Sequence, residues 1–343
     1  MKDARPIVAI TMGDPAGIGP EIAAKALARR EVYKICRPLI VGDAEVMRQG
    51  IRIAGVSLCV RSIAQVGEAA FQHGGMDVLD LKNVDVTRLE LGKVVASAGD
   101  VAFKAIKKAI RLALDKCVDA TVTGPIHKEA LNAAGHRYAG HTEIFAQHTR
   151  TTDYAMLLVY GDLRVIHVTT HIPLRQASDS ITKARVLRVI ELADAACKRL
   201  SIPDPRIGVA GLNPHASDGG LFGREEQDQI SPAIEAARSA GIRVEGPLPP
   251  DTLFPLAMGG RFDVCVAMYH DQGHIPLKMA GFRWDRDKGR WESVNGVNIT
   301  LGLPIIRTSV DHGTAFDIAG KGIASPDSMI HAIEYAARLA RER

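Results

Sequence analysis

The sequence has no apolar run approaching the roughly 20 residues that a membrane-spanning helix needs. Its N-terminal apolar run is short and leads into Gly-Asp-Pro rather than a small-residue cleavage site, so no signal peptide is expected. Net charge is only +4, and no stretch combines clustered Lys and Arg with interleaved aromatic residues, which argues against nucleic acid as a partner. We therefore expect a cytoplasmic protein that binds neither membrane nor nucleic acid.

Cysteine is also scarce. The five cysteines are scattered, odd in number and mostly set inside apolar runs, a pattern typical of reduced core residues rather than of a disulfide frame or a zinc knuckle. They are Cys36, Cys59, Cys117, Cys197 and Cys265.

The familiar nucleotide-binding signatures are absent. The glycines of GDPAGIGPE (13–21) fall at 13, 17 and 19, which is not a GxGxxG fingerprint, and no Gly-Lys-Ser/Thr of a P-loop follows. Backbone N–H groups at the start of the next helix could still receive an anion. A tight strand-to-helix turn with Pro20 entering the helix explains the segment equally well.

Short apolar runs alternate with segments of helical period along the 343 residues, a length that favours two domains. This alternation predicts an α/β fold with a largely parallel, covered sheet. Strands are predicted at 6–12, 37–42, 119–125, 154–160, 165–171, 206–212 and 263–268, and helices at 22–30, 100–117, 183–200, 225–240 and 327–341. The strands at 154–160 and 165–171 are predicted to form a hairpin, and the polar segment 283–293 an exposed loop or flap.

Polar residues collect where apolar runs end, as in TGPIHKE (123–129), THIPLR (170–175), NPHASDGG (213–220) and YHDQGH (269–274). In open α/β sheets ligands bind beyond the carboxyl ends of strands, so these loops are candidates for one shared crevice. His171, His215 and His270 each follow a predicted strand, and three imidazoles on separate loops can hold a divalent metal with positions open for substrate. Their spacing has no local signature, and separate roles in loop capping or packing remain open.

Three further groups of polar residues are candidates for a binding site or for a purely structural role. GHTE (140–143) opens a helix-like segment where Thr142 is either an ordinary N-cap or, with His141, part of an anion site. Lys278, Asn298 and Arg307 lie near other polar residues and suit phosphate or carboxylate, although each alone can be a surface group. SVDHGTAFDIAG (309–320) is interpreted as a turn entering a capped helix. The pattern thus indicates an enzyme for a small anionic substrate without naming its reaction.

Several long motifs together resemble the 4-hydroxythreonine-4-phosphate dehydrogenase (PdxA) family, in order and over almost the whole chain. They are GDPAGIGPE, TGPIHKEALNAAGHRYAGHTEIFA, TTHIPLR, GLNPHASDGGLFGREE, GPLPPDTLF, YHDQGHIPLK and VNITLGLPIIRTSVDHGTAFDIAG. The resemblance implies an isocitrate/isopropylmalate-dehydrogenase-like fold with two α/β/α domains flanking a cleft. It also implies a homodimer whose active sites use both subunits. The expected domains are 1–135 with 297–343, and a dimerising 136–296.

The resemblance assigns roles to individual residues. It implies metal ligands at His171, His215 and His270, one of them donated by the partner subunit, for one divalent ion per site (Zn, Mg, Mn or Co). Substrate-binding positions fall on His141, Thr142, Lys278, Asn298 and Arg307. Asp251 and Asp271 occupy acidic positions near the active site, with Lys278 as proton donor or acceptor. NAD is the implied cofactor, bound without a Rossmann fingerprint.

One departure concerns substrate choice. GFRWDRDKGRWES separates Lys278 from Asn298, where the family's vitamin B6 enzymes have a compact link, and this resembles a second, catabolic subgroup. That subgroup oxidises and decarboxylates 4-phospho-D-threonate or 4-phospho-D-erythronate to dihydroxyacetone phosphate, and we expect the insertion to cover the cleft and help select the substrate. The alternatives are 4-hydroxythreonine-4-phosphate dehydrogenase of pyridoxal phosphate biosynthesis, a dihydrodiol dehydrogenase of aromatic catabolism and a phosphate acyltransferase of related fold.

Overall fold

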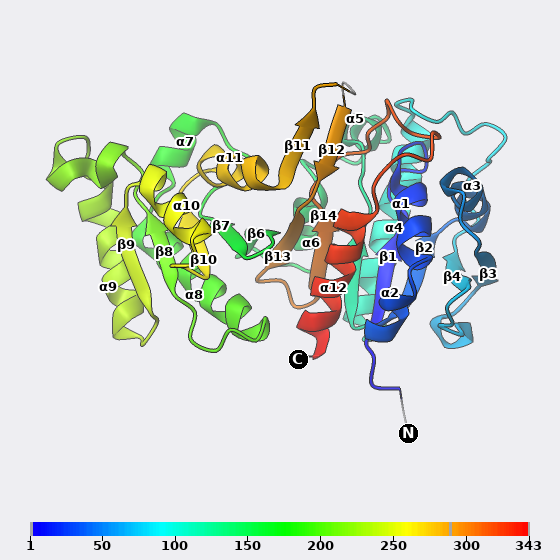
Figure 1. The fold of residues 1–343 in the computed structure, drawn as a ribbon, viewed down its shortest axis with the longest axis horizontal. Helices are drawn as coiled ribbons and strands as arrows, with labels where there is room; N and C mark the ends of the chain where they lie inside the picture. The colour runs from blue at the N-terminus through cyan, green and yellow to red at the C-terminus, as the bar shows by residue number, and fades with distance from the viewer. Residues whose placement is uncertain (1–2, 288–289, 342–343) are drawn as a thin grey trace. The chain divides into compact units, whose positions relative to one another are not determined.

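The computed structural model describes residues 3–287 and 290–341, which form two compact units. Unit 1 consists of Met1–Thr152 and Leu303–Arg343, and unit 2 is Asp153–Gly302. The first unit is thus discontinuous in sequence. Residues 136–152 belong to unit 1 and residues 297–302 to unit 2, although the sequence-based division placed each segment in the other domain. Figure 1 shows the order of the elements along the chain.

Unit 1 is built on a fully parallel sheet. Its strand order is β3-β4-β2-β1-β5-β14. The bounds are β1 (Ile7–Thr11), β2 (Arg37–Gly42), β3 (Cys59–Ile63), β4 (Gly75–Asp80), β5 (Ala120–Thr123) and β14 (Ile306–Val310). The central strands β1 and β5 are near-continuous apolar or Thr runs, as expected for strands covered on both faces.

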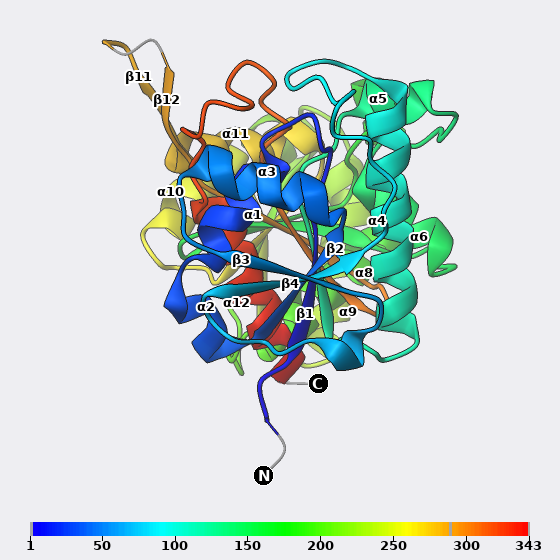
Figure 2. The same cartoon turned by 90° about the vertical axis from the view of Figure 1, so that its right-hand side faces the viewer.

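Helices lie on both faces of this sheet (Figure 2). On one face α4 packs against β1, β2 and β5, and on the other α12 packs against β14, β5 and β1. The bounds are α1 (Gly19–Leu27), α2 (Arg30–Ile35), α3 (Ala44–Ala54), η1 (Val66–Glu68), α4 (Ala96–Leu114), α5 (Lys128–Ala133), α6 (His141–His148) and α12 (Asp327–Arg341). The apolar stripe of α4 buries Phe103, Ile106 and Ile110 in a core shared with β1, β2 and α6.

Unit 2 has a mixed sheet of order β13-β6-β7-β10-β8-β9. β6 pairs antiparallel with both β7 and β13, whereas β7, β10, β8 and β9 run parallel. The bounds are β6 (Ala155–Tyr160), β7 (Leu163–His167), β8 (Ile207–Ala210), β9 (Val244–Leu248), β10 (Val264–Ala267) and β13 (Val297–Leu301). The predicted hairpin across Gly161 and Asp162 is confirmed.

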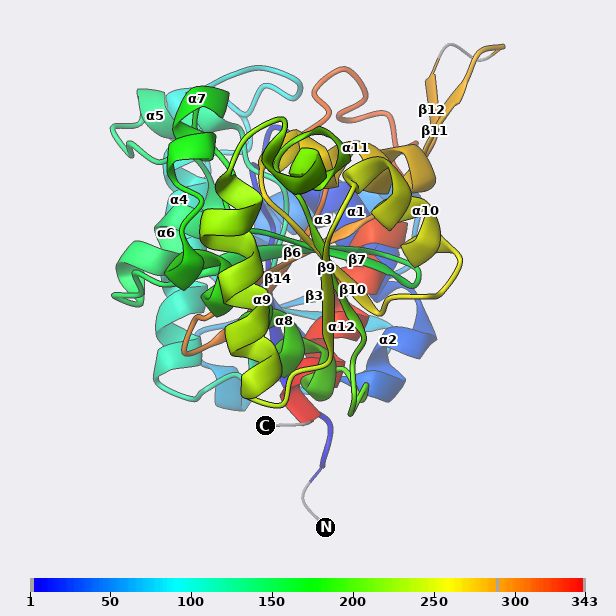
Figure 3. The same cartoon turned by 90° about the vertical axis from the view of Figure 1, so that its left-hand side faces the viewer.

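Helices cover both faces of this second sheet as well (Figure 3), with α8 and α9 on one side and α10 and α11 on the other. The bounds are α7 (Leu174–Asp179), α8 (Lys183–Arg199), η2 (Pro214–Gly220), the π-helical turn η3 (Glu226–Ile230), α9 (Ser231–Ser239), α10 (Pro250–Met258) and α11 (His270–Gly281). α11 starts directly after β10 and packs on β7, β6 and β10, so the strand end fixes the position of its first residue, His270.

The segment 283–293 was expected to be an exposed loop or flap, and of these two it is not a loop. β11 (Phe282–Asp285) and β12 (Arg290–Val294) pair as an antiparallel ribbon, whose residues 288 and 289 lie outside the described part. A second expectation is wrong, because the segment 309–320 does not enter a helix. After β14 the chain runs through turns, with positive φ at Ala315 (43°) and Gly320 (80°), and the next helix is α12.

The cysteines follow the prediction in part. All five are free thiols, and Cys36, Cys197 and Cys265 are buried, but Cys59 and Cys117 are exposed. Among residues 3–287 and 290–341, no helix has the length and apolarity needed to cross a membrane.

Candidate active site

The GDPAGIGPE segment forms a tight strand-to-helix turn. Gly13 has φ of +77°, and a Cβ there would lie 2.4 Å from the carbonyl oxygen of Pro125, so the turn requires glycine. Its N–H groups already donate within the chain: Asp14 to Pro125, Gly17 to Asp14, Ile18 to Thr314, and Ala16 to the Asp14 carboxylate. Pro20 enters α1 as expected. The geometry supports the turn reading over the anion-binding reading.

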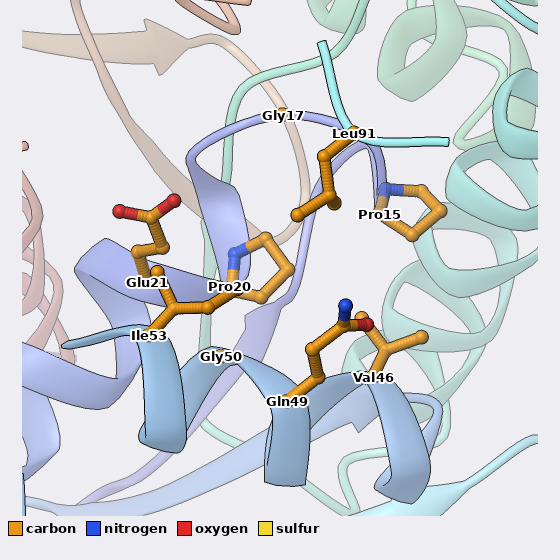
Figure 4. A pocket seen from close by; sticks show the side chains of 9 residues that line it. All are labelled: Pro15, Gly17, Pro20, Glu21, Val46, Gln49, Gly50, Ile53 and Leu91. Atoms are coloured by element: carbon orange, nitrogen blue, oxygen red, sulfur yellow. The ribbon is translucent and has the colours of Figure 1, made fainter. Parts of the chain in front are cut away.

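A small pocket lies behind this turn in unit 1 (Figure 4). Its walls come from the start of α1, from α3 and from Leu91, and are largely apolar. The Glu21 carboxylate on its rim already accepts hydrogen bonds from the N–H groups of Gly320 and Gly322. None of the predicted site residues lines this pocket, so it does not define the active site.

A buried cation, the Arg307 guanidinium, is the main candidate binding group of unit 1. Arg307 on β14 is only 2% exposed, and its Nη2 donates to Thr123 Oγ1 at 2.9 Å. Its guanidinium also lies over the ring of Phe145 on α6, 5.6 Å from the centroid. Burial lowers the pKa of Arg307 to about 9, while Glu143 acts in the opposite direction. The group therefore stays charged at neutral pH and provides a fixed positive charge beside Thr123, the last residue of β5.

His141 and Thr142 form the first turn of α6 in the same unit. The helix begins at His141 after Gly140, and Thr142 does not cap it as one reading of the sequence proposed. The Nε2 atom of His141 is buried without a hydrogen-bond partner among the described residues, and burial together with Arg307 lowers the pKa of this imidazole well below its usual value. A neutral imidazole, a helix N-terminus and a guanidinium thus occur together, which suits a bound anion.

Two predicted metal ligands come together in unit 2. The rings of His171, which follows β7, and His270, the first residue of α11, have centroids 5.7 Å apart. Asp271 Oδ1 lies 2.7 Å from His270 Nδ1, so that nitrogen carries the proton and Nε2 is left as the ring nitrogen for a ligand. This donor pair fits two coordination positions of a divalent cation.

Below His270 lies a row of buried imidazoles. His274 stacks on His270 with centroids 3.6 Å apart, and His167 follows at 4.7 Å from His274. Burial lowers the pKa of His274 to about 4 and that of His167 to about 3, so both are neutral at physiological pH. The Nδ1 of His274 lies 2.9 Å from the carbonyl oxygen of His270, which ties the two turns of α11 together.

His215 is placed differently from the other two histidines. It is exposed in η2, with its ring 6.2 Å from that of Phe222, and the part of the chain that the structure describes holds no group of three His, Cys, Asp or Glu able to bind a metal ion. Five consecutive residues of η2, His215 to Gly219, have positive φ. Such backbone is strained for residues other than glycine.

The remaining predicted residues also belong to unit 2. Lys278 lies on α11 with Nζ 4.4 Å from the centroid of the Phe282 ring. Asn298 on β13 donates to Met156 Sδ at 2.9 Å, while its Oδ1 is buried with no hydrogen bond among the described residues. Asp251 is exposed in the first turn of α10.

Sequence reasoning missed several groups that shape these sites. Thr123 and Phe145 position Arg307, and Glu226 and Gln272 fix the loops around the histidines. Thr123 ends a predicted strand and Gln272 lies within YHDQGH, which are signals that could have been followed. Glu226 lies in a stretch predicted simply as helix, and nothing in the sequence distinguishes it from Glu225.

Comparison with known proteins fits this arrangement. A family model described as "Pyridoxal phosphate biosynthetic protein PdxA" matches residues 34–336. The match spans most of the chain, and the chain belongs to this family. It has the two α/β/α units that the motifs implied.

Individual members of this family are similar to the chain over nearly its whole length. The chain is 50% identical to a D-threonate 4-phosphate dehydrogenase of Cupriavidus necator over 100% of both chains. It is also 50% identical to a D-threonate 4-phosphate dehydrogenase of Salmonella typhimurium, over 97% of this chain and 98% of the relative. A crystal structure of a 4-hydroxythreonine-4-phosphate dehydrogenase from Klebsiella pneumoniae superposes with a TM-score of 0.82 at 47% identity, covering 98% of this chain and 99% of that one.

Proposed function

We propose that this chain is a nicotinamide-dependent, divalent-metal-assisted dehydrogenase of a 4-phosphorylated four-carbon hydroxy acid. The substrates we propose are 4-phospho-D-threonate, as in the named relatives, and 4-phospho-D-erythronate. The observation that carries the proposal is the buried Arg307 beside the N-terminal turn of α6, a site for a small dianion.

The phosphate would be held in unit 1. Arg307 supplies a charge that burial keeps poorly hydrated, and such a group gains most from an anionic partner. His141 and Thr142 supply polar groups at the positive end of the α6 dipole. A substrate without phosphate would make no use of this buried positive charge, which weighs against a dihydrodiol dehydrogenase.

The metal would be held by His171 and His270 of unit 2, with His215 of the partner subunit as the third ligand in a homodimer. The exposure of His215, which leaves its imidazole accessible to a second copy of the chain, supports this assignment. Asp271 orients His270 through its Nδ1 proton.

When bound, the divalent cation and NAD supply polarisation of the C3 hydroxyl and acceptance of hydride from C3. Lys278 takes or returns the proton of that hydroxyl, and Asn298 positions the acid through its amide. Oxidation at C3 gives a 3-oxo acid. Loss of its carboxyl group as CO2 and protonation at C2 then give dihydroxyacetone phosphate. A phosphate acyltransferase would require none of these histidines.

The deciding experiment measures NADH formation by purified enzyme with Mg²⁺, Mn²⁺, Co²⁺ or Zn²⁺. The substrates are 4-phospho-D-threonate, 4-phospho-D-erythronate and 4-phosphohydroxy-L-threonine, with CO2 and dihydroxyacetone phosphate measured in parallel. We expect turnover of the hydroxy acids to exceed that of the amino acid and one CO2 per NADH. NADH without CO2 would overturn the decarboxylation step, and inactivity on all three substrates would overturn the proposal.

The second candidate is 4-hydroxythreonine-4-phosphate dehydrogenase, because the Klebsiella pneumoniae enzyme of that name is 47% identical to this chain. That substrate carries a 2-amino group in place of the 2-hydroxyl. Preference for the amino acid in the same assay would select this candidate.

A further inference from the structure

The turn that carries His215 is held by one buried carboxylate. Glu226 is 2% exposed, and its Oε1 accepts from the N–H groups of Leu212 and Asn213 at 2.8 and 2.7 Å. Its Oε2 accepts from Asn213 Nδ2 at 2.9 Å. Three bonds from one side chain thus hold the two residues that precede the Pro214–Gly220 turn.

The backbone of the turn needs such an anchor. His215, Ala216, Ser217 and Asp218 have φ between 44° and 73°, which non-glycine residues rarely adopt and which persists only where surrounding contacts enforce it. Two bonds close the far end, because the Ser217 hydroxyl donates to the Gly223 carbonyl and Gln227 Nε2 donates to Gly219 at 2.8 Å. Gln227 follows Glu226 directly, so one short segment holds both ends of the turn.

Close packing leaves Glu226 little freedom. A Cβ on Gly211 would lie 2.8 Å from the Ala216 Cα and 3.2 Å from Glu226 Oε1, so the turn folds back onto the end of β8. Gln272 of α11 donates to the Gly211 carbonyl and accepts from the Met268 N–H, which joins this strand end to the segment before His270. Glu226 also opens the π-helical turn η3, a distortion frequent at functional sites.

We propose that Glu226 is a positioning residue for His215: its carboxylate holds the left-handed turn in the one shape that presents the imidazole as a metal ligand. This inference rests on the proposed function, in which His215 binds the divalent cation. Glu226 acts through its hydrogen bonds to the Leu212 and Asn213 backbone and to the Asn213 side chain, and is not itself a metal ligand.

The test is titration of metal-free enzyme with Co²⁺, followed by the visible absorption of the bound ion. Glu226→Ala should weaken Co²⁺ binding about 10–100-fold, the usual range for a residue that orients a metal ligand. Glu226→Gln should stay within about threefold, since its amide oxygen still accepts from both backbone N–H groups. It loses only the bond from Asn213 Nδ2, which keeps Glu225 Oε2 as an acceptor at 2.7 Å. Loss of a merely electrostatic attraction would affect both variants alike, and would overturn the proposal. Glu235→Ala, at an exposed position of α9, is the matched control.

A double-mutant cycle with His215→Ala shows whether the effect passes through His215. The double variant should bind Co²⁺ no more weakly than His215→Ala alone, whereas additive losses would overturn the inference. Ser217→Ala loosens the same turn without touching Glu226 and should weaken binding in the same direction if Glu226→Ala folds poorly.

Two outcomes would distinguish a failure of this inference from a failure of the proposed function. Weakened binding in His215→Ala with unchanged binding in Glu226→Ala would sink the inference and leave the proposed function standing. Unchanged binding in His171→Ala, His215→Ala and His270→Ala would refute the metal site itself, and the inference with it. A lower unfolding midpoint of metal-free Glu226→Ala, with unaltered Co²⁺ affinity and spectrum, would reduce Glu226 to a structural role.

Discussion

Arg307 is the residue whose environment says most about the substrate. A guanidinium that is 2% exposed, set over the Phe145 ring and donating to the Thr123 hydroxyl, provides a fixed positive charge toward which an anion can bind. The neighbouring His141 is neutral and therefore adds no repulsion or competing charge at physiological pH.

The first prediction concerns this residue. Arg307→Lys keeps the charge but loses the planar fork of donors, so KM for 4-phospho-D-threonate should rise roughly 10–100-fold, as for loss of one charged hydrogen bond of about 1.5–3 kcal/mol. Steady-state kinetics measure it, with exposed Arg111→Lys on α4 as control. Turnover of unphosphorylated D-threonate should not change. An unaltered KM for the phosphorylated acid would contradict the assignment.

At the scale of elements, α11 depends on one glycine. A Cβ on Gly273 would lie 2.4 Å from His167 Nε2 and 2.7 Å from Val165 Cγ1, because the helix sits directly on β7. This close approach sets the depth of His270 and His274 above the sheet.

Gly273→Ala should therefore destabilise the protein by about 1–3 kcal/mol through overpacking. In an open helix the same change gains roughly 0.5–1 kcal/mol, so the sign of the effect tests the packing. Urea unfolding followed by circular dichroism measures it. Gly67→Ala, where a Cβ meets nothing within 4 Å, is the control and should be near neutral. A stabilised Gly273→Ala would show that α11 is not held against β7.

We expect the β11–β12 ribbon to influence substrate choice, because the Phe282 ring at its start lies against the Lys278 ammonium. Replacing residues 283–293 by a short Gly-Ser link should lower the preference for the hydroxy acids over 4-phosphohydroxy-L-threonine. Global stability should change little, because a two-stranded ribbon with exposed side chains contributes little core. Ratios of kcat/KM for the two substrates measure the preference. Phe282→Ala isolates the contact with Lys278, and unchanged ratios in both variants would refute the role of the ribbon.

At the scale of the whole molecule, the sequence predicted those strands and helices whose positions are set by a local pattern of apolar residues. Strand 37–42 matches β2 residue for residue because RPLIVG is a bounded apolar run. β3 escaped notice because CVRSI is largely uncovered and has no apolar run, and β14 because its polar residues were interpreted as a site. The left-handed turn at His215 could not be foreseen, since its φ angles are imposed by long-range contacts with Glu226 and Gln227.

The pH dependence of stability should carry the signature of Asp14. This carboxyl is fully buried, and burial raises its pKa from 3.8 to about 6. A carboxyl with a raised folded-state pKa is held better when protonated, so its ionisation destabilises the fold as pH rises through 6. The total is about 3 kcal/mol at 1.36 kcal/mol per pKa unit, of which roughly 1–2 kcal/mol develops between pH 5 and 8.

Asp14→Asn should lose this dependence, and its stability relative to the parent should increase by that amount from pH 5 to 8. Urea unfolding at the two pH values measures the change. Because His127 faces Asp14, the pair should be repeated with His127→Gln in both proteins. Equal relative stability at both pH values would show that Asp14 does not titrate in this range.

The β11–β12 ribbon has a final, practical consequence. The chain contains two tryptophans, Trp284 and Trp291, and both lie in this ribbon, in edge-to-face contact at 5.2 Å and about half exposed. All intrinsic tryptophan emission therefore originates in one surface element, so the enzyme carries its own fluorophore on the ribbon. Substrate titrations followed by this emission would report the ribbon without any label. Thermal melts followed the same way would report its fraying and remain blind to both cores.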